Sequence, residues 1–368
     1  MEVIAVNEKP MFVPWDKYVF NRDASLNLII FERRRGKTFG LREQMLRDYL
    51  ANGERHVAIV RHKDDIQVVA NGYFDDVAEK TGDEKLKHKL ADYEFLTQGS
   101  TVKIRRKSDD VKKRNKWDTI LTVIPLSKAD RYKQITLHKL RRVAFDEALI
   151  DKKLNPYSRY LPNEFSILQN VIGTLERYAD ADSTGRCRLR VYLMGNAVDL
   201  TNAYFAALGI NEPPKFGARW LANKTWFFCY PDPADFAPLP PEKSIAAGMG
   251  ERTSDYGNVF DASATDFIEK KTRAAKFAFG VVYRGESFGV WADYNRGLYF
   301  INTKIPKDTP LPVYALSTDD NKPNYIVAKR ANKTLQGLAD LYCYGILRYD
   351  TPATREHFDS VLSLFGVR

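Results

Sequence analysis

The sequence contains few of the residues that build disulfide frameworks, zinc sites and membrane spans. It has three cysteines, Cys187, Cys229 and Cys343, which lie far apart and form no CxxC pair. Its five histidines form no HExxH motif. The longest apolar stretches, such as 120–125, are far shorter than the roughly 20 residues that span a bilayer. The first residues also lack the basic-then-apolar pattern of a secretory signal. We therefore expect a soluble intracellular protein in a reducing compartment.

The composition indicates a folded, basic protein. The chain has 368 residues, of which 44% are hydrophobic, so it can bury the cores of two domains. There are 57 Lys and Arg residues against 47 Asp and Glu residues, which gives a net charge of +10. This excess favours a polyanionic partner such as nucleic acid, although many basic proteins have none.

The first two hundred residues alternate β-rich runs with helical patterns, which is typical of a mostly parallel α/β sheet with flanking helices. A hairpin is expected over 93–107, with its tip at 98–100. The expected helices cover 37–51, 72–90 and 162–178. The expected strands cover 25–31, 56–61, 119–126, 142–145 and 188–194.

The composition changes after residue 208. A proline-rich stretch, followed by Gly and Ser, predicts a linker over 209–255 that is partly folded around Trp220, Trp226 and Phe227. Beyond it, the sequence predicts four aromatic-rich strands and two closing helices, which form an α+β domain. The expected division is a first domain at 1–208, the linker at 209–255 and a second domain at 256–368. The four strands are expected at 277–283, 288–293, 298–303 and 312–317. The two helices are expected at 332–347 and 354–365.

A candidate phosphate-binding loop lies between the first strand and the first long helix. The segment 31–38 reads Phe-Glu-Arg-Arg-Arg-Gly-Lys-Thr. Gly36 would let the backbone approach phosphate groups, Lys37 would bind them, and Thr38 would ligate Mg²⁺. The full GxxxxGK[ST] pattern is not met because Phe31 occupies the first glycine position. A simple basic turn is the alternative interpretation.

A second candidate motif is a short strand that ends in two carboxylates, Asp146 and Glu147. The carboxyl ends of strands are where α/β sheets bind ligands. Asp146 would hold Mg²⁺ beside Thr38, and Glu147 would polarise the attacking water. An Asp-Glu pair after a strand is often a solvated turn, but its occurrence together with the Gly-Lys-Thr segment is more specific.

Basic residues are concentrated between Lys103 and Lys116, where eight of them accompany two acidic residues. Such a run is suited to sequence-independent binding of nucleic acid phosphates, although a solvated charged loop is the alternative. The candidate DNA-binding residues are Lys103, Arg105, Arg106, Lys107, Lys112, Lys113 and Arg114.

The chain resembles the DNA-encapsidation ATPases of small podophages of the Picovirinae type. In the first domain, the resemblance rests on Gly-Lys-Thr, Phe145-Asp146-Glu147, 160–164 (Tyr-Leu-Pro-Asn-Glu) and 195–197 (Gly-Asn-Ala), in that order. In the second domain, it rests on the segments 268–271, 276–279, 282–283, 289–293, 297–298 and 301–303. It covers nearly the whole chain. It implies an ASCE-type P-loop ATPase joined to a ribonuclease-H-like domain that has lost its nuclease chemistry.

The resemblance also implies roles for individual residues. Lys37 and Thr38 take the Walker A roles, and Asp146 and Glu147 take the Walker B roles. Arg33 and Arg35 resemble the arginines that precede Gly-Lys in viral terminases and would contact nucleotide. The remaining matches are Arg177 on a trans-acting arginine finger, Asn196 on the γ-phosphate sensor, and Lys133 and Lys63 on basic positions that act across subunits.

The function implied by the resemblance is ATP-driven packaging of viral double-stranded DNA into a procapsid, in the host cytoplasm and without a membrane. The protein would form a homomeric ring, expected to be a pentamer, and would use ATP and Mg²⁺ at subunit interfaces. Its further partners would be the portal (connector) and a structural packaging RNA.

Two alternatives remain open. The first is a terminase large subunit with an active C-terminal nuclease, for which the candidate metal ligands are Asp293, Asp319 and Asp320. No further convincing carboxylates accompany them, so we favour a vestigial nuclease domain. The second alternative is a nucleic-acid-binding protein with an inactive P-loop, for which Phe31 is the best argument.

Overall fold

The computed structural model describes residues 9–108, 117–132, 137–151, 158–198, 200–221, 224–237, 266–328 and 332–367. The chain divides into two compact units. The first comprises the described parts of Met1–Ile150, Asn163–Val198 and Lys215–Val259, and the second those of Asp151–Pro162, Asp199–Pro214 and Phe260–Arg368. No helix within the described ranges is both long enough and apolar enough to cross a membrane.

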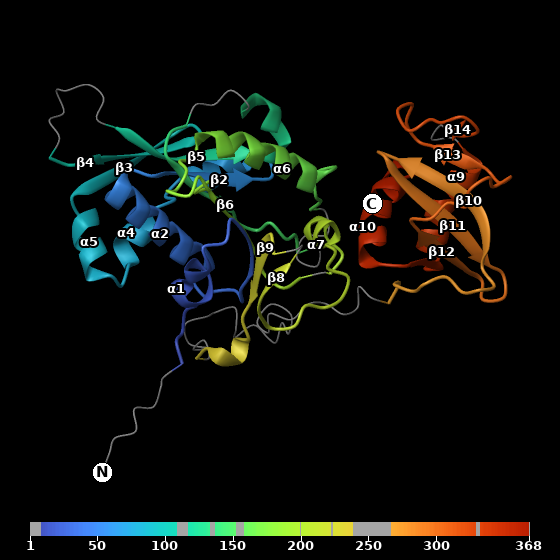
Figure 1. Cartoon of the computed structure of the whole chain (residues 1–368), viewed down its shortest axis with the longest axis horizontal. Helices are drawn as coiled ribbons and strands as arrows, with labels where there is room; N and C mark the ends of the chain where they lie inside the picture. Colours follow the sequence, from blue (N-terminus) through green and yellow to red (C-terminus); the bar gives the residue numbers. More distant parts are fainter. Residues whose placement is uncertain are drawn as a thin grey trace, which may run out of the picture. The chain divides into compact units, whose positions relative to one another are not determined.

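The first unit, coloured blue to yellow in Figure 1, is built on one large sheet. The sheet has nine strands in the order β3-β4-β5-β2-β6-β7-β1-β9-β8. The six central strands, from β5 to β9 in this order, are parallel, and an antiparallel partner borders them on each side. The strands are β1 (Leu26–Ile30), β2 (Arg55–Val60), β3 (Tyr93–Gln98), β4 (Thr101–Arg106), β5 (Asp118–Pro125), β6 (Leu140–Phe145), β7 (Arg190–Gly195), β8 (Gly217–Leu221) and β9 (Trp226–Tyr230).

Short helices and one long helix connect these strands. The helices of the first unit are α1 (Trp15–Tyr18), α2 (Lys37–Asn52), α3 (Asp65–Ala70), α4 (Asp75–Lys80), α5 (Glu84–Leu90) and α6 (Glu164–Leu175). The 3₁₀ turns within the described part of this unit are η1 (Phe20–Arg22), η2 (Leu126–Tyr132), η3 (Glu176–Tyr178) and η4 (Pro233–Asp235). The helix expected over 72–90 is two helices, because Asp83 starts α5 by accepting hydrogen bonds from the N–H groups of Lys85 and Leu86.

The stretch 217–230 of the predicted linker is folded, as expected around Trp220, Trp226 and Phe227, but it is part of the first unit rather than a linker. There β8 and β9 belong to the first sheet, and β9 pairs in parallel with β1. All five residues of β9 are buried, since its sequence Trp-Phe-Phe-Cys-Tyr supplies apolar side chains to both faces of the sheet. This stretch is therefore part of the first unit rather than a separate linker.

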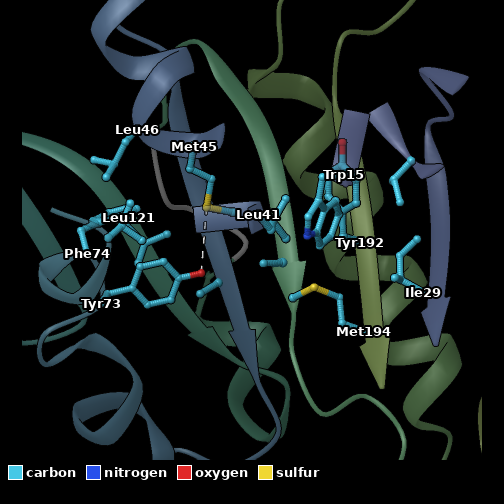
Figure 2. Packing of buried hydrophobic residues seen from close by; sticks show 14 of the residues in the cluster. Trp15, Ile29, Leu41, Met45, Leu46, Tyr73, Phe74, Leu121, Tyr192 and Met194 are labelled. Carbon is cyan, nitrogen blue, oxygen red and sulfur yellow. Dashed lines mark hydrogen bonds between the residues drawn. The ribbon is translucent and has the colours of Figure 1, made fainter. Parts of the chain in front are cut away.

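Helix α2 covers the central strands through one apolar face. Leu41, Met45 and Leu46 are at most 1% exposed. Figure 2 shows Met45 with the Tyr73 hydroxyl, which donates a hydrogen bond to its sulfur at 4.0 Å. Trp15 lies beside Tyr192 of β7, with 6.1 Å between the ring centroids. This core fixes α2 and the loop before it on the sheet.

Trp15 leaves no space for a side chain at Gly40, in the first turns of α2. A Cβ built at Gly40 would lie 2.1 Å from Cδ1 of Trp15. We expect Gly40→Ala to lower the free energy of unfolding by about 1–3 kcal/mol through overpacking. Gly173→Ala in α6 is the matched control, because nothing lies within 4 Å of its Cβ. It should instead stabilise by about 0.5–1 kcal/mol. Equal effects of the two variants in urea unfolding would contradict this packing.

His56 makes the first unit sensitive to acid. Its side chain is 1% exposed, Nε2 donates to the Met45 carbonyl at 2.8 Å, and Nδ1 has no hydrogen-bond partner among the described residues. Burial lowers the pKa of His56 from 6.5 to about 3. Between these values the unfolded chain binds a proton that the folded chain does not, so stability is lost as the pH falls.

We expect the free energy of unfolding to fall by about 1.4 kcal/mol per pH unit well below pH 6.5 from this histidine alone. His56→Gln should flatten that dependence, as measured by urea unfolding between pH 7 and pH 4. His88→Gln, at an exposed position of α5, should leave it unchanged. If the free energy of unfolding had the same pH dependence in wild type and His56→Gln, His56 would not be the source of the acid sensitivity.

The sheet of the second unit is drawn in orange to red in Figure 1. It has six strands in the order β14-β13-β10-β11-β12-β15. Strands β10, β11 and β12 form an antiparallel meander, and β13 and β14 continue in parallel beside β10. This is the ribonuclease-H-like arrangement, with β15 added beside β12. The strands are β10 (Lys276–Tyr283), β11 (Glu286–Asp293), β12 (Leu298–Asn302), β13 (Val313–Ala315), β14 (Ile326–Val327) and β15 (Leu347–Tyr349).

Among the described residues, three helices group with this unit: α7 (Ala203–Leu208), α9 (Lys333–Cys343) and α10 (Pro352–Leu364). Leu335, Leu338 and Phe358 from α9 and α10 are fully buried in one core with Val290 and Ile301 of the sheet. The helix expected over 332–347 ends at Cys343, because Gly345 has a φ of +68° and the chain then enters β15.

Candidate functional site

The candidate site lies where three neighbouring parallel strands end. In the sheet, β7 lies between β6 and β1. The loop 31–36 follows β1, Asp146 and Glu147 follow β6, and Asn196 follows β7. The carboxyl ends of parallel strands meet at one edge of the sheet, so the two predicted motifs are brought together with a third residue between them.

The loop before α2 is shaped to present backbone N–H groups. Gly36 has a φ of +77° and Arg34 a φ of +65°, both in the left-handed region. Gly36 precedes the helix and offers no side chain that caps its first turn. The N-terminus of α2 therefore combines unsatisfied N–H groups with the positive end of the helix dipole, which favours an anion such as phosphate.

Lys37 and Thr38 contact the ends of the other two strands. The Thr38 hydroxyl donates to Oδ2 of Asp146 at 2.5 Å, and Nζ of Lys37 donates to Oδ1 of Asn196 at 2.9 Å. Burial lowers the pKa of Lys37, whereas the charges of Asp146 and Glu147 act in the opposite direction. These four side chains form one polar cluster at the edge of the sheet, with Glu147 within electrostatic reach of Lys37.

Phe31 occupies the first glycine position of the phosphate-loop pattern without disturbing the loop. Its N–H donates to the Gly195 carbonyl at 3.3 Å, which continues the pairing of β1 with β7. Its φ is not positive, and its side chain is fully buried against Trp15, with 5.6 Å between the ring centroids. The backbone at this position therefore has no need of the freedom that glycine supplies.

Arg35 was predicted to bind nucleotide, and the structure gives it a different role. Its guanidinium donates to Glu32 at 2.5 Å and to the carbonyls of Met11 and Ala237 at 3.0 and 2.7 Å. The residue is 4% exposed. It ties the loop to flanking segments and does not face the polar cluster. Arg33, in contrast, is half-buried, and its charge contributes to lowering the pKa of Lys37.

The turn after β6 has an unusual backbone. Glu147 has a φ of +53°, which non-glycine residues seldom adopt, and its side chain is exposed. Its N–H donates to Oδ1 of Asp146 at 3.0 Å, and the next N–H, that of Ala148, donates to the Met194 carbonyl at 2.9 Å. Strained backbone of this kind persists where the surrounding structure holds it, often at functional sites.

A buried ion pair beside this turn was not predicted from the sequence. The Arg61 guanidinium, just after β2, binds both carboxylate oxygens of Glu164 at 2.8 and 2.9 Å. It also donates to the carbonyls of Ala148 at 2.9 Å and Glu147 at 3.5 Å. Glu164 stands in the Tyr-Leu-Pro-Asn-Glu segment that carried the family resemblance, and this was the available signal.

The residues predicted to act across subunits lie outside the polar cluster where they are described. Arg177 is in η3, after α6; it is exposed and has no hydrogen-bond or ion-pair partner among the residues that the structure describes. Lys63 is exposed in the turn between β2 and α3. Lys133 lies outside the described residues.

The predicted DNA-binding residues fall on the β3–β4 hairpin and beyond it. Lys103 donates to Gln98 at 2.7 Å, Arg105 pairs with Glu94, and Arg106 donates to the Tyr93 hydroxyl at 2.9 Å. Lys107 donates to the Ala91 carbonyl at 2.7 Å. These contacts orient the side chains along an outer strand of the sheet. Lys112, Lys113 and Arg114 lie outside the described residues.

The candidate nuclease carboxylates of the second unit are used in turns. Asp293 accepts hydrogen bonds from Thr272 at 2.5 Å and from the N–H of Asn295 at 3.1 Å, and the Thr272 bond contributes most to a pKa below its usual range. Asp320 accepts from the N–H groups of Arg284 and Gly285 at 2.8 and 2.7 Å. Asp319 is exposed. Within the described ranges, no group of three or more His, Cys, Asp or Glu residues is arranged to hold a metal ion.

The sheet order and the cluster at its carboxyl edge define the first unit as an ASCE-type P-loop NTPase fold, in which one strand separates the phosphate-loop strand from the acidic strand. Sequence comparison gives the family. The chain belongs to the podovirus DNA encapsidation protein (Gp16) family, whose profile matches residues 8–362.

Individual relatives agree with this assignment. The chain is 30% identical over 340 residues to a DNA packaging protein of Bacillus phage phi29, covering 90% of this chain and 92% of the relative. It is 27% identical over 340 residues to that of Bacillus phage B103, covering 90% and 95%. A chain from the bacteriophage Phi-29 viral genome packaging motor assembly has a similar structure, with a TM-score of 0.67, 26% identity and coverage of 96% and 99%.

Proposed function

We propose that this protein is an ATPase that drives viral double-stranded DNA into a procapsid as a homomeric ring. The observation that carries the proposal is the convergence of Lys37, Thr38, Asp146 and Asn196 from three adjacent strand ends, in a chain of the DNA encapsidation family. The described relatives are named for DNA packaging, which supports the same process for this chain.

The residues present suit a nucleoside triphosphate and Mg²⁺. The N-terminus of α2 provides N–H donors, and the ammonium group of the half-buried Lys37 provides a charge for phosphate oxygens. The Thr38 hydroxyl and the Asp146 carboxylate place two oxygen atoms 2.5 Å apart, and oxygen ligands are those that Mg²⁺ prefers. When bound, Mg²⁺ neutralises charge on the β- and γ-phosphates.

The side chains of the protein perform the other steps of ATP hydrolysis. Lys37 exchanges its hydrogen bond with Asn196 for phosphate oxygens, which frees the Asn196 amide to contact the γ-phosphate. Glu147, exposed beside this position, orients a water molecule and accepts its proton. Arg33 adds positive charge near the phosphates. Arg177 of a neighbouring subunit supplies the charge that the transferring phosphoryl group needs, and Lys63 and Lys133 assist across the interface.

The ring would carry DNA through repeated basic contacts. Its stoichiometry is proposed as five, and its partners as the portal and a structural packaging RNA. The related Phi-29 chain is part of a viral genome packaging motor assembly, which supports a multi-subunit complex. Lys103, Arg105, Arg106 and Lys107, together with Lys112, Lys113 and Arg114, are the proposed phosphate contacts, and identical loops in a ring would add their weak contacts.

We further propose that the second unit does not cut DNA. Asp293 and Asp320 use their oxygens to accept hydrogen bonds from backbone N–H groups and hydroxyls, and this leaves them poorly suited to bind two metal ions.

The test is ATP hydrolysis by the purified full-length protein, with and without double-stranded DNA, and nucleotide binding by calorimetry. Wild type is expected to bind ATP·Mg²⁺, to hydrolyse it, and to turn over faster with DNA of any sequence. Lys37→Ala should abolish both binding and hydrolysis. A protein that binds DNA but gives no heat with ATP would overturn the proposal in favour of a nucleic-acid-binding protein with an inactive P-loop.

A further inference from the structure

The buried pair of Arg61 and Glu164 has no role in the nucleotide chemistry described above, yet it adjoins the turn that carries Glu147. The side chain of Glu164 is fully buried, and that of Arg61 is 10% exposed. A buried carboxylate is costly unless an opposite charge and hydrogen bonds compensate it. Here the planar guanidinium binds it with two parallel hydrogen bonds, the geometry that gives such pairs both strength and direction.

Arg61 also contacts the end of β6 and the turn that follows it. Its guanidinium carbon lies 5.3 Å from the centre of the Phe145 ring. Its terminal nitrogens donate to the carbonyls of Glu147 and Ala148, the two residues after Asp146. One side chain therefore connects the start of α6, through Glu164, to the backbone carbonyls of Glu147 and of the residue after it.

This backbone needs such support. The left-handed conformation of Glu147 costs a non-glycine residue about 1 kcal/mol or more, so the turn relaxes unless other contacts hold it. Relaxation would turn the exposed Glu147 side chain away from the polar cluster. The contacts of Lys37 and Thr38 would persist, because they come from α2, from Asp146 itself and from Asn196.

We propose that Arg61 and Glu164 are positioning residues for ATP hydrolysis: the ion pair anchors the carbonyls of Glu147 and Ala148 to α6 and thereby aims the Glu147 carboxylate at the attacking water. The pair contributes to kcat and contributes little to nucleotide affinity. This inference rests on the proposed function, since Glu147 is its target.

The test compares Glu164→Gln, which keeps the side-chain volume, with Arg61→Lys, which keeps the charge but loses the forked donor geometry. Misaligned catalytic groups lose about 10- to 100-fold in rate, and we expect a loss of this size in kcat for both variants. Binding of ADP·Mg²⁺ by calorimetry should stay within about threefold of wild type, the pattern of a group that acts after binding. Hydrogen exchange in the peptide that contains residues 145–149 should become faster in both.

The matched control is Glu54→Gln. Glu54 precedes the opposite end of β2 and pairs with Arg188 at 2.6 Å, with its side chain 5% exposed. Breaking this pair should lower the melting temperature without changing kcat or exchange at 145–149. The Glu54→Gln control therefore distinguishes a general loss of stability from a loss of the correct orientation of Glu147.

Two results would overturn the inference. One is wild-type kcat in Glu164→Gln; the other is unchanged exchange at 145–149 in both site variants. The second readout does not require activity. Should wild type fail to hydrolyse ATP, the proposed function falls, while the exchange measurement still decides whether the ion pair holds the turn.

Discussion

Replacing Glu147 by glutamine is expected to lower kcat for ATP hydrolysis by about 100- to 10,000-fold, the range that positioned general bases contribute. The amide keeps the size of the side chain but does not accept the proton of the attacking water. Nucleotide affinity should stay close to that of wild type, because the groups proposed to hold phosphate are the N-terminus of α2, Lys37 and Thr38. The measurement is steady-state hydrolysis combined with calorimetric titration of ATP·Mg²⁺.

The control for this variant is Glu79→Gln in α4, which removes an exposed carboxylate elsewhere in the same unit. It should hydrolyse ATP at the wild-type rate. Glu147→Gln retaining most of its activity would show that another group activates the water.

Replacing Arg177 by alanine is expected to lower hydrolysis in the assembled protein by about three orders of magnitude or more, the contribution of arginine fingers elsewhere. Arg177 is exposed in η3 and unpaired among the described residues, which suits a side chain that acts on a neighbouring subunit. The activity of wild type per subunit should therefore also fall on dilution, as the proposed ring dissociates.

Mixing two inactive variants tests the direction of this contact. Glu147→Gln subunits keep Arg177, and Arg177→Ala subunits keep Glu147, so a mixture contains interfaces in which both residues are present. An equal mixture should regain roughly a quarter of wild-type activity if subunits assemble at random around a ring. The proposal that Arg177 acts on a neighbouring subunit would be contradicted by two results together. These are full activity of a dilute wild-type monomer and wild-type activity of Arg177→Ala.

Much of the fold follows from local patterns in the sequence. The strands β1, β2, β5, β6 and β7 are short apolar runs, buried on both faces, as a central parallel sheet requires. The proline-rich stretch was misleading because proline marks a turn equally well inside a domain and between domains. The pairing of β9 with β1, two hundred residues apart in the sequence, shows that this stretch lies inside a domain.

The parts of the site that could be predicted are those formed by short motifs of neighbouring residues in the sequence. The sequence predicted that the Gly-Lys-Thr segment and the Asp-Glu pair meet, and the Thr38–Asp146 hydrogen bond confirms it. It did not distinguish Arg33 from Arg35, two identical side chains in one loop, because the direction of each depends on partners such as Glu32 and Ala237. The Arg61–Glu164 pair joins positions 103 residues apart, and neither belongs to a motif with a known mechanism.

The most direct test is a structure of the assembled protein with Mg²⁺ and a non-hydrolysable ATP analogue. We expect the β- and γ-phosphates at the N-terminus of α2, with Nζ of Lys37 moved from Asn196 to a phosphate oxygen and Glu147 facing the terminal phosphate. An analogue bound elsewhere, with Lys37 still hydrogen-bonded to Asn196, would contradict the account.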